Sequence, residues 1–217
     1  MRTIHRFCPK TTMSKPVIDL CELGQISTNH AYNLDIVYMA KSHMQFQTNP
    51  NCPPDAFQAL FQDTFTASES SDEGRLIGHL AKQLALDSRT DNHAIIDEHH
   101  GIRASAFTSP LANENGVNAL LLAPVAVHPD NQGQGLARWL IESIVQSIKG
   151  NGCDILITYG DPALYGRFGF EGISPEVARP PYPLQFPEGW QAIIFTDKGR
   201  LSANYQCVRP FLNADLW

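Results

Sequence analysis

The sequence has no run of apolar residues that approaches the roughly 18 needed to span a membrane. It also lacks an excess of positive charge, because 16 Lys and Arg residues against 22 Asp and Glu residues give a formal net charge of −6. This acidic balance argues against nucleic acid or an anionic membrane surface as the main partner. No apolar segment follows the basic residues near the N-terminus, so no signal peptide is expected.

The five cysteines form no CxxC motif and no Cys/His pattern with zinc spacing. Unbridged thiols in a reducing cytoplasm are the simplest interpretation, so we expect a cytoplasmic protein. His99 and His100 fall in an expected hairpin turn without a third partner at metal-ligand spacing, and no metal site is predicted. Walker and G-x-S-x-G motifs are also missing, which excludes two common kinds of catalytic site.

The 217 residues suit one domain with an extension, and 43% hydrophobic content is enough for a packed core. Residues 1–43 match no recognisable motif, and we interpret them as an N-terminal extension of unknown role. Residues 44–217 carry the periodic apolar patterns and are expected to form the domain.

The spacing of apolar residues in this part of the chain predicts an α/β fold. Helices are expected at 55–66, 73–86 and 135–149, and strands at 45–48, 93–97, 102–108, 118–127, 154–159, 190–196 and 205–208. The last two strands are expected to pair around a turn at 197–199, and the proline-rich stretch 174–189 to remain irregular. Asp55 is the expected N-cap of the first helix.

The most informative stretch is the glycine-containing turn at 130–138, which lies between an apolar strand and a helix. The first N–H groups of a helix have no partner within the helix and lie at the positive end of its dipole. Because Gly133 and Gly135 would allow close approach to the backbone, this order predicts a site for a pyrophosphate. The dinucleotide fingerprint G-x-G-x-x-G fits poorly, since Arg138 replaces the third glycine. A turn with a purely structural role is the other alternative.

Two motifs in sequence carry a family resemblance. Gln132-x-x-Gly135-x-Ala137 resembles the Q/R-x-x-G-x-G/A acetyl-CoA motif of GNAT N-acetyltransferases. After one helix and one strand, the segment 161–170, Asp-Pro-Ala-Leu-Tyr-Gly-Arg-Phe-Gly-Phe, is similar to the L-Y-x-x-x-G-F block of that family. The residues of this segment are most similar to the YhbS-like branch of predicted acetyltransferases. The resemblance extends from about residue 44 to the C-terminus.

The resemblance implies a GNAT-like α/β fold: a mixed, mostly antiparallel sheet with a splayed parallel strand pair, flanked by helices. Pro124 within the strand 118–127 agrees with such a splay, because proline in a strand marks an edge or a bulge. The resemblance also implies that acetyl-CoA is the cosubstrate. The residues that would bind its pantetheine arm are Val125, Ala126 and Val127, and those that would bind its pyrophosphate are Gln132, Gly133, Gln134, Gly135, Leu136 and Ala137. Further positive charge for the phosphates could come from Arg103, Arg138, Lys149 and Arg167.

Tyr165 matches the tyrosine that lies near the CoA sulfur in this family. Its implied role is that of a general acid toward the leaving thiolate, and packing of the ring is the structural alternative. The strand leading into the acetyl-CoA motif has no carboxylate, so a directly placed general base is in doubt. Glu114, His128 and Asp161 are weaker candidates, and a water chain or an amine that arrives neutral is the expected answer.

The predicted function is therefore acetyl-CoA-dependent transfer of an acetyl group to an amine by direct attack in a ternary complex. The missing strand carboxylate leaves open a non-catalytic acyl-CoA-binding regulatory domain of the same fold, and the glycine turn alone leaves open a nucleotide-binding module. The acceptor could be a small molecule or a protein amine, with no nucleic-acid or membrane partner. The proline-rich loop and closing strands could join a homodimer.

Overall fold

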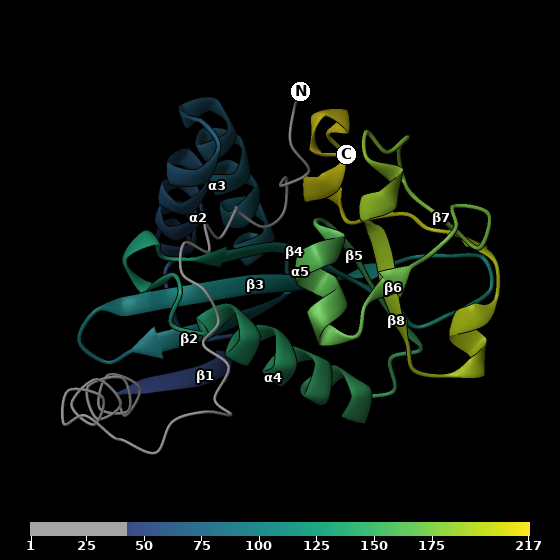
Figure 1. The fold of residues 1–217 in the computed structure, drawn as a ribbon, viewed down its shortest axis with the longest axis horizontal. Coiled ribbons are helices and arrows are strands. Elements are labelled where there is room, and N and C mark those ends of the chain that lie inside the picture. Colours follow the sequence, from purple (N-terminus) through teal and green to yellow (C-terminus); the bar gives the residue numbers. More distant parts are fainter. Residues whose placement is uncertain (1–42) are drawn as a thin grey trace, which may run out of the picture.

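The computed structural model describes residues 43–217, so the predicted N-terminal extension lies outside the described residues except for His43. Seven strands form one sheet in the order β1-β2-β3-β4-β5-β8-β6 (Figure 1). They are β1 (Met44–Thr48), β2 (Asp91–Asp97), β3 (Gly101–Leu111), β4 (Ala119–Val127), β5 (Ile155–Tyr159), β6 (Glu171–Gly172) and β8 (Trp190–Ile194). Within this sheet of the described residues, β4 and β5 are the only parallel neighbours, and the other pairs are antiparallel. The predicted mixed, mostly antiparallel sheet is confirmed.

Helices cover both faces of this sheet. The helices α2 (Pro54–Ser68) and α3 (Ser71–Leu86) lie on one face, and α4 (Leu136–Gly150) lies on the other (Figure 1). A short helix, α5 (Pro162–Tyr165), follows β5. Within the described residues, no helix has the length and apolar character needed to cross a membrane.

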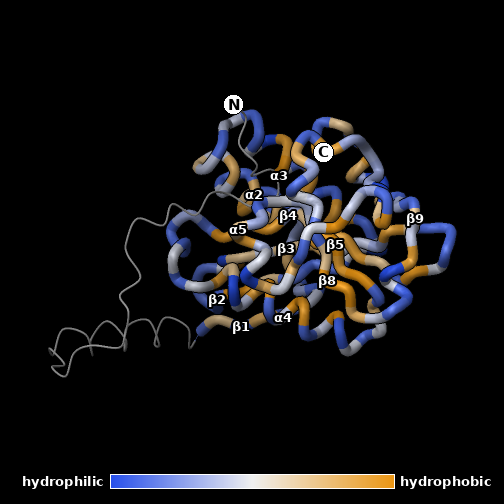
Figure 2. Tube along the Cα trace, turned by 45° about the vertical axis from the view of Figure 1, so that its right-hand side comes forward, coloured by the Kyte–Doolittle hydropathy of each residue, from blue (hydrophilic) through white to orange (hydrophobic). Residues whose placement is uncertain are grey.

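Strand alternation divides the buried side chains into two cores. Ile155 and Ile157 of β5 join the core under α2 and α3, whereas Leu156 between them joins the core under α4. This is the period of two expected of a strand that is buried on both faces. Apolar residues accordingly concentrate along the central strands and polar residues along the surrounding loops in Figure 2.

The start of α2 differs from the prediction. Asp55 is not the N-cap, because the helix begins one residue earlier at Pro54, with Pro53 in the capping position. The fixed φ of proline suits the first helical turn, where its missing N–H is not needed. The side chain of Asp55 instead pairs with Lys82 of α3 and so links the two helices.

The C-terminal prediction is partly wrong. β8 forms as expected, but its partners are β5 and β6, and the segment 205–208 contributes only one isolated bridge, between Gln206 and Ala112. A separate two-stranded sheet joins β7 (Ala178–Arg179) to β9 (Ala203–Asn204). Because β6 already occupies the free edge of β8, the last residues pack instead as short turns against the core under α2 and α3. The buried members of that segment are Tyr205, Val208, Phe211, Leu216 and Trp217.

Candidate active site

The parallel pair of strands separates part of the way along the sheet. Pairing of β4 with β5 covers only Ala119–Leu121 against Ile155–Ile157. Beyond that point Thr158 Oγ1 donates a hydrogen bond to the carbonyl oxygen of Leu122 at 3.0 Å, so a side chain replaces the backbone ladder. The two strands then continue without pairing to Val127 and Tyr159.

A bulge at Pro124 accompanies this separation. The register between β3 and β4 shifts so that Phe107 alone faces both Ala123 and Pro124. An extra residue on one strand bends that strand, and proline cannot donate a ladder hydrogen bond at this point. The predicted bulge at Pro124 is present, and it lies next to the point where β4 leaves β5.

The unpaired edge of β4 offers backbone hydrogen-bonding groups. The N–H of His128 donates to the carbonyl of Arg103 on β3 at 2.8 Å. Because hydrogen-bonding direction alternates along an antiparallel ladder, the N–H groups of Val127 and Val125 point to the other edge, from which β5 has diverged. By the same alternation, the N–H of Ala126 points toward its partner Ser105 on β3.

The glycine turn places an open helix N-terminus at the end of this edge. Gly133 and Gly135 have φ angles of 76° and 78°, a left-handed conformation that favours glycine. Gly135 occupies the N-cap of α4 without a side-chain capping hydrogen bond, and no acidic residue lies in the first turn. Apart from its two chain neighbours, no described residue has an atom within 4 Å of the position that a Cβ at Gly133 would occupy. The partial positive charge of the helix dipole is therefore not neutralised here, and there is space for an anion.

The other members of the predicted phosphate segment take structural positions. Leu136 is buried in the core under α4, and Ala137 packs partly against it. Gln132 donates through Nε2 to the carbonyl of Val127 at 3.3 Å, and Gln134 donates to the carbonyl of Asp130 at 3.2 Å. The side chain of Gln132 therefore ties the turn to the end of β4, and that of Gln134 stabilises the turn itself.

The basic residues near the turn are not equivalent. Arg103 lies beside the turn on β3, and its Nε is buried with no hydrogen-bond partner among the described residues. Arg138 pairs with Glu142 at 2.9 Å and lies over the ring of Phe168. Lys149 lies in the last turn of α4, at the far end of the helix from the glycine turn. Arg103 is thus the one of these three basic residues that has a buried donor without a partner among the described residues.

Tyr165 is fully buried at the end of α5. Its ring packs edge-on against Phe170, with centroids 5.5 Å apart, and belongs to the core that also contains Val125 and Leu136. The structure therefore brings the C-terminal motif, β4 and the start of α4 into one cluster. Gly160, between β5 and α5, leaves the space that this ring fills.

The candidates for a general base all have other partners. Glu114 accepts hydrogen bonds from the backbone and side-chain nitrogens of Asn204, and it lies before β4, at the opposite end from Val127. His128 Nδ1 accepts from the N–H of Asp130 at 3.3 Å. Asp161 accepts from the N–H of Ala163 at 2.8 Å, which is the capping role that an Asp-Pro pair favours. The contacts of these three side chains therefore give no support to a role as general base.

Sequence reasoning missed Thr64 and Thr158, which shape the edge of β4. Thr64 of α2 donates to the carbonyl of Leu60 at 2.7 Å and lies 3.3 Å from the carbonyl of Val127. Each threonine lies in an apolar pattern of its own element, so no local signal distinguishes it from an ordinary core position. Their roles depend on which strand the fold places beside them.

A family profile described as "Acetyltransferase (GNAT) domain" matches residues 89–172, the segment that contains β3, β4, the glycine turn and α4. This segment is therefore similar to a GNAT acetyltransferase domain. A stretch of 50 residues of this chain is 50% identical to the "Uncharacterized N-acetyltransferase YhbS" of Escherichia coli strain K12. A second relative, "Uncharacterized N-acetyltransferase YjhQ" of the same strain, is 35% identical over 96 residues, which are 42% of this chain and 52% of YjhQ.

Solved structures of GNAT acetyltransferases share the fold of this chain. YhbS from Escherichia coli in complex with CoA matches with a TM-score of 0.65 and 23% identity, over 78% of this chain and 92% of that one. A GNAT acetyltransferase from Brucella melitensis in complex with acetyl-CoA matches with a TM-score of 0.61 and 19% identity, over 78% and 98%. In sequence, the match to YhbS spans 23% of this chain and 30% of YhbS.

Proposed function

We propose that this protein transfers the acetyl group of acetyl-CoA to an amine. The observation that carries the proposal is the uncapped N-terminus of α4 beside the free edge of β4, which together offer an anion site and a row of backbone groups. Val125 and Val127 would hold the pantetheine arm, and the turn from Gln132 to Ala137, with Arg103, would hold the pyrophosphate. The CoA-bound and acetyl-CoA-bound GNAT structures that share this fold support this use.

The proposed reaction needs no covalent acyl-enzyme. The amine lone pair attacks the thioester carbonyl carbon, the carbon–sulfur bond breaks, and the sulfur takes a proton from the Tyr165 hydroxyl. The nitrogen loses its proton to water. Backbone N–H groups on the free edge of β4 would stabilise the negative charge that develops on the carbonyl oxygen, an interaction that typically accelerates acyl transfer by about 10²- to 10³-fold.

The described cysteines support direct attack. Burial raises the pKa of Cys153 and of Cys207 to about 11, so both stay protonated near neutral pH and are poor nucleophiles. Burial also raises the pKa of Cys52. The described cysteines are free thiols, which suits the cytoplasmic location that we propose.

For the acceptor, we propose only its chemical class. A net charge of −6 favours a cationic amine, small or on a protein, over nucleic acid. A homodimer remains a prediction. We propose that residues 44–217 form the catalytic domain, with 1–43 as an extension to it.

A matched pair of variants tests cofactor binding. Gly133→Glu places a negative charge where the phosphates would lie, whereas Gly133→Asn meets the same positive φ and adds no charge. Calorimetric titration with acetyl-CoA should give at least tenfold weaker binding for Glu than for Asn. Equal affinities in the two variants, or binding of NAD in place of acetyl-CoA, would refute the proposed site.

A second candidate function, a regulatory domain that binds acyl-CoA without turnover, is favoured by one observation. The strand β4 has no carboxylate, and Glu114 is engaged elsewhere. Release of CoA thiol, measured against a panel of polyamines, amino acids, aminoglycosides and peptides, separates the two functions. Tight acetyl-CoA binding with no thiol release above the rate measured without protein would favour the regulatory domain.

A further inference from the structure

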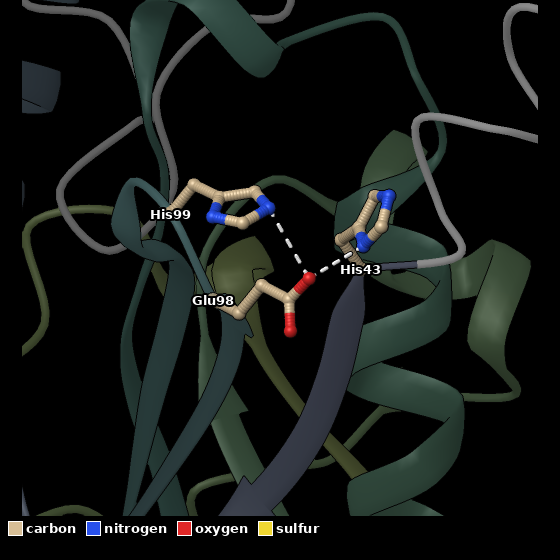
Figure 3. A group of neighbouring side chains, drawn as sticks. All are labelled: His43, Glu98 and His99. Carbon is tan, nitrogen blue, oxygen red and sulfur yellow. Dashed lines mark hydrogen bonds and ion pairs between the residues drawn. The ribbon is translucent and has the colours of Figure 1, made fainter.

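Three side chains with metal-ligating atoms meet at one edge of the sheet. His43 lies just before β1, and Glu98 and His99 form the turn between β2 and β3 (Figure 3). Glu98 Oε1 lies 2.6 Å from His43 Nδ1 and 3.2 Å from His99 Nε2. One atom from each of the three lies within 4.8 Å of the other two. Sequence alone gave His99 and His100 no third partner, and the fold brings His43 to Glu98, which lies 55 residues away in the sequence and next to His99.

We propose that His43, Glu98 and His99 bind a divalent transition metal, with Zn²⁺ as the occupant. Ligand distances of about 2.0–2.2 Å in a tetrahedral zinc site put neighbouring ligand atoms about 3.3 Å apart. Both contacts already made by Glu98, at 2.6 and 3.2 Å, are shorter than this value, so the side chains have to rotate slightly apart to enclose an ion. Two imidazoles and one carboxylate form a borderline donor set that suits zinc better than Mg²⁺ or Ca²⁺.

The backbone around the cluster is fixed before any metal binds. The N–H of Glu98 donates to the carbonyl of His43 at 3.2 Å, which ties the start of β1 to the turn. Asp97 Oδ1 accepts the N–H groups of His99 and His100 at 2.9 and 3.0 Å and lies 2.9 Å from His100 Nδ1. Asp97 therefore acts as a positioning residue for the turn. His100 is held by Asp97 and stays outside the metal cluster.

The site has room for a water ligand and is separate from the acetyl-CoA site. The side chains of His43, Glu98 and His99 are 53%, 57% and 64% exposed, so solvent reaches the fourth coordination position. His43 precedes β1, and Glu98 and His99 lie in the turn between β2 and β3, so none of the three belongs to β4 or to the glycine turn. A metal there would join β1 to the hairpin and stabilise the sheet edge by mass action. This inference does not depend on acetyl transfer.

Zinc titration of the full chain without an affinity tag tests the site. We expect one Zn²⁺ per chain by calorimetry and a rise in Tm that saturates at the same ratio. The variants His43→Ala and His99→Ala should each lower the affinity at least tenfold, and Glu98→Gln should lower it severalfold. His79→Ala is the matched control, since it removes an exposed imidazole from α3 and should leave binding unchanged.

Two results would overturn the proposal. One is wild-type affinity no higher than that of the His43→Ala/His99→Ala double variant, which would place any zinc on other residues such as the cysteines. The other is an equal loss of binding in His79→Ala, which would indicate nonspecific surface imidazole binding. Circular dichroism of each variant confirms that the fold is retained, because the three side chains are exposed.

Discussion

A Cβ atom built on Gly160 would lie 2.6 Å from Cε2 of Tyr165, so only glycine at this position leaves the tyrosine ring its place. Gly160 is also fixed by its backbone, because its N–H donates to the carbonyl of Gly189 at 3.0 Å and its carbonyl accepts from Gln191 Nε2 at 3.1 Å. The ring and the residue that follows β5 are therefore fitted to each other.

Gly160→Ala should displace the Tyr165 ring and lower kcat for acetyl transfer more than it raises the KM for acetyl-CoA. The reason is steric, since a contact below 3 Å forces the ring or the backbone to move. Steady-state kinetics measure the effect, and Gly172→Ala is the control, because its Cβ would meet no atom within 4 Å. Equal loss of activity in both variants would contradict this relationship.

Tyr165→Phe keeps the ring packed against Phe170 and removes the hydroxyl group. If this hydroxyl protonates the departing thiolate, kcat should fall about 10²-fold while acetyl-CoA affinity stays the same. Stopped-flow release of CoA and calorimetry separate the two quantities. A variant that turns over at the wild-type rate would leave Tyr165 as a packing residue.

Thr158→Val should lower the free energy of unfolding by about 1–3 kcal/mol, because it leaves the buried carbonyl of Leu122 without its donor. Thr158→Ser keeps the hydroxyl and loses only a methyl group, so it should cost less. Urea denaturation at pH 7 compares the two. If valine is tolerated better than serine, the hydrogen bond does not hold the strands at this point.

His93 should make the protein less stable as the pH falls from about 6.5 to about 4. Burial lowers the pKa of His93 from 6.5 to about 4, against a smaller opposing effect of Asp91. The unfolded chain therefore binds the proton more readily than the folded chain in this range, and stability is lost on acidification. The full effect is about 3 kcal/mol.

Denaturation of His93→Asn at several pH values tests this assignment, since Asn keeps a polar group near Thr48 and Thr108. The variant should lose less stability than the wild type between pH 6.5 and 4.5. Hydrogen bonds from His100 to Asp97 and from Thr196 to Asp154 lower the pKa of each carboxyl. Protonation of these two carboxyls therefore reduces the stability of the protein below pH 3.8, outside the range of His93. An unchanged slope in the variant would rule out His93 as the source.

The central elements could be predicted because their signals are local. Apolar spacing located α4, which ends at Gly150, two residues before Gly152 with its left-handed φ of 74°. Pro124 indicated a bulge that the register of β3 and β4 confirms. The strand pairing near the C-terminus, in which β8 pairs with β6 and β9 pairs with β7, could not be predicted. The strands β6 and β9 are two residues long and carry no periodic pattern.

The candidate site was predictable only as far as its motifs reached. The glycine turn and Tyr165 each lie in a short sequence motif, and the fold brings both motifs to the core under α4. Thr64, Thr158 and His43 act across 36 to 63 residues of sequence, so their contacts depend on the assembled sheet. No pattern within one element reports such contacts.

The short pairing of β4 with β5 has a mechanical consequence. Three residue pairs join a four-stranded half of the sheet, β1 to β4, to a three-stranded half, β5, β8 and β6. A molecule bound to the edge of β4 and reaching Tyr165 after β5 would touch both halves. It would hold the two halves together across this three-pair junction, and amide hydrogen exchange would slow on both sides of the junction at once.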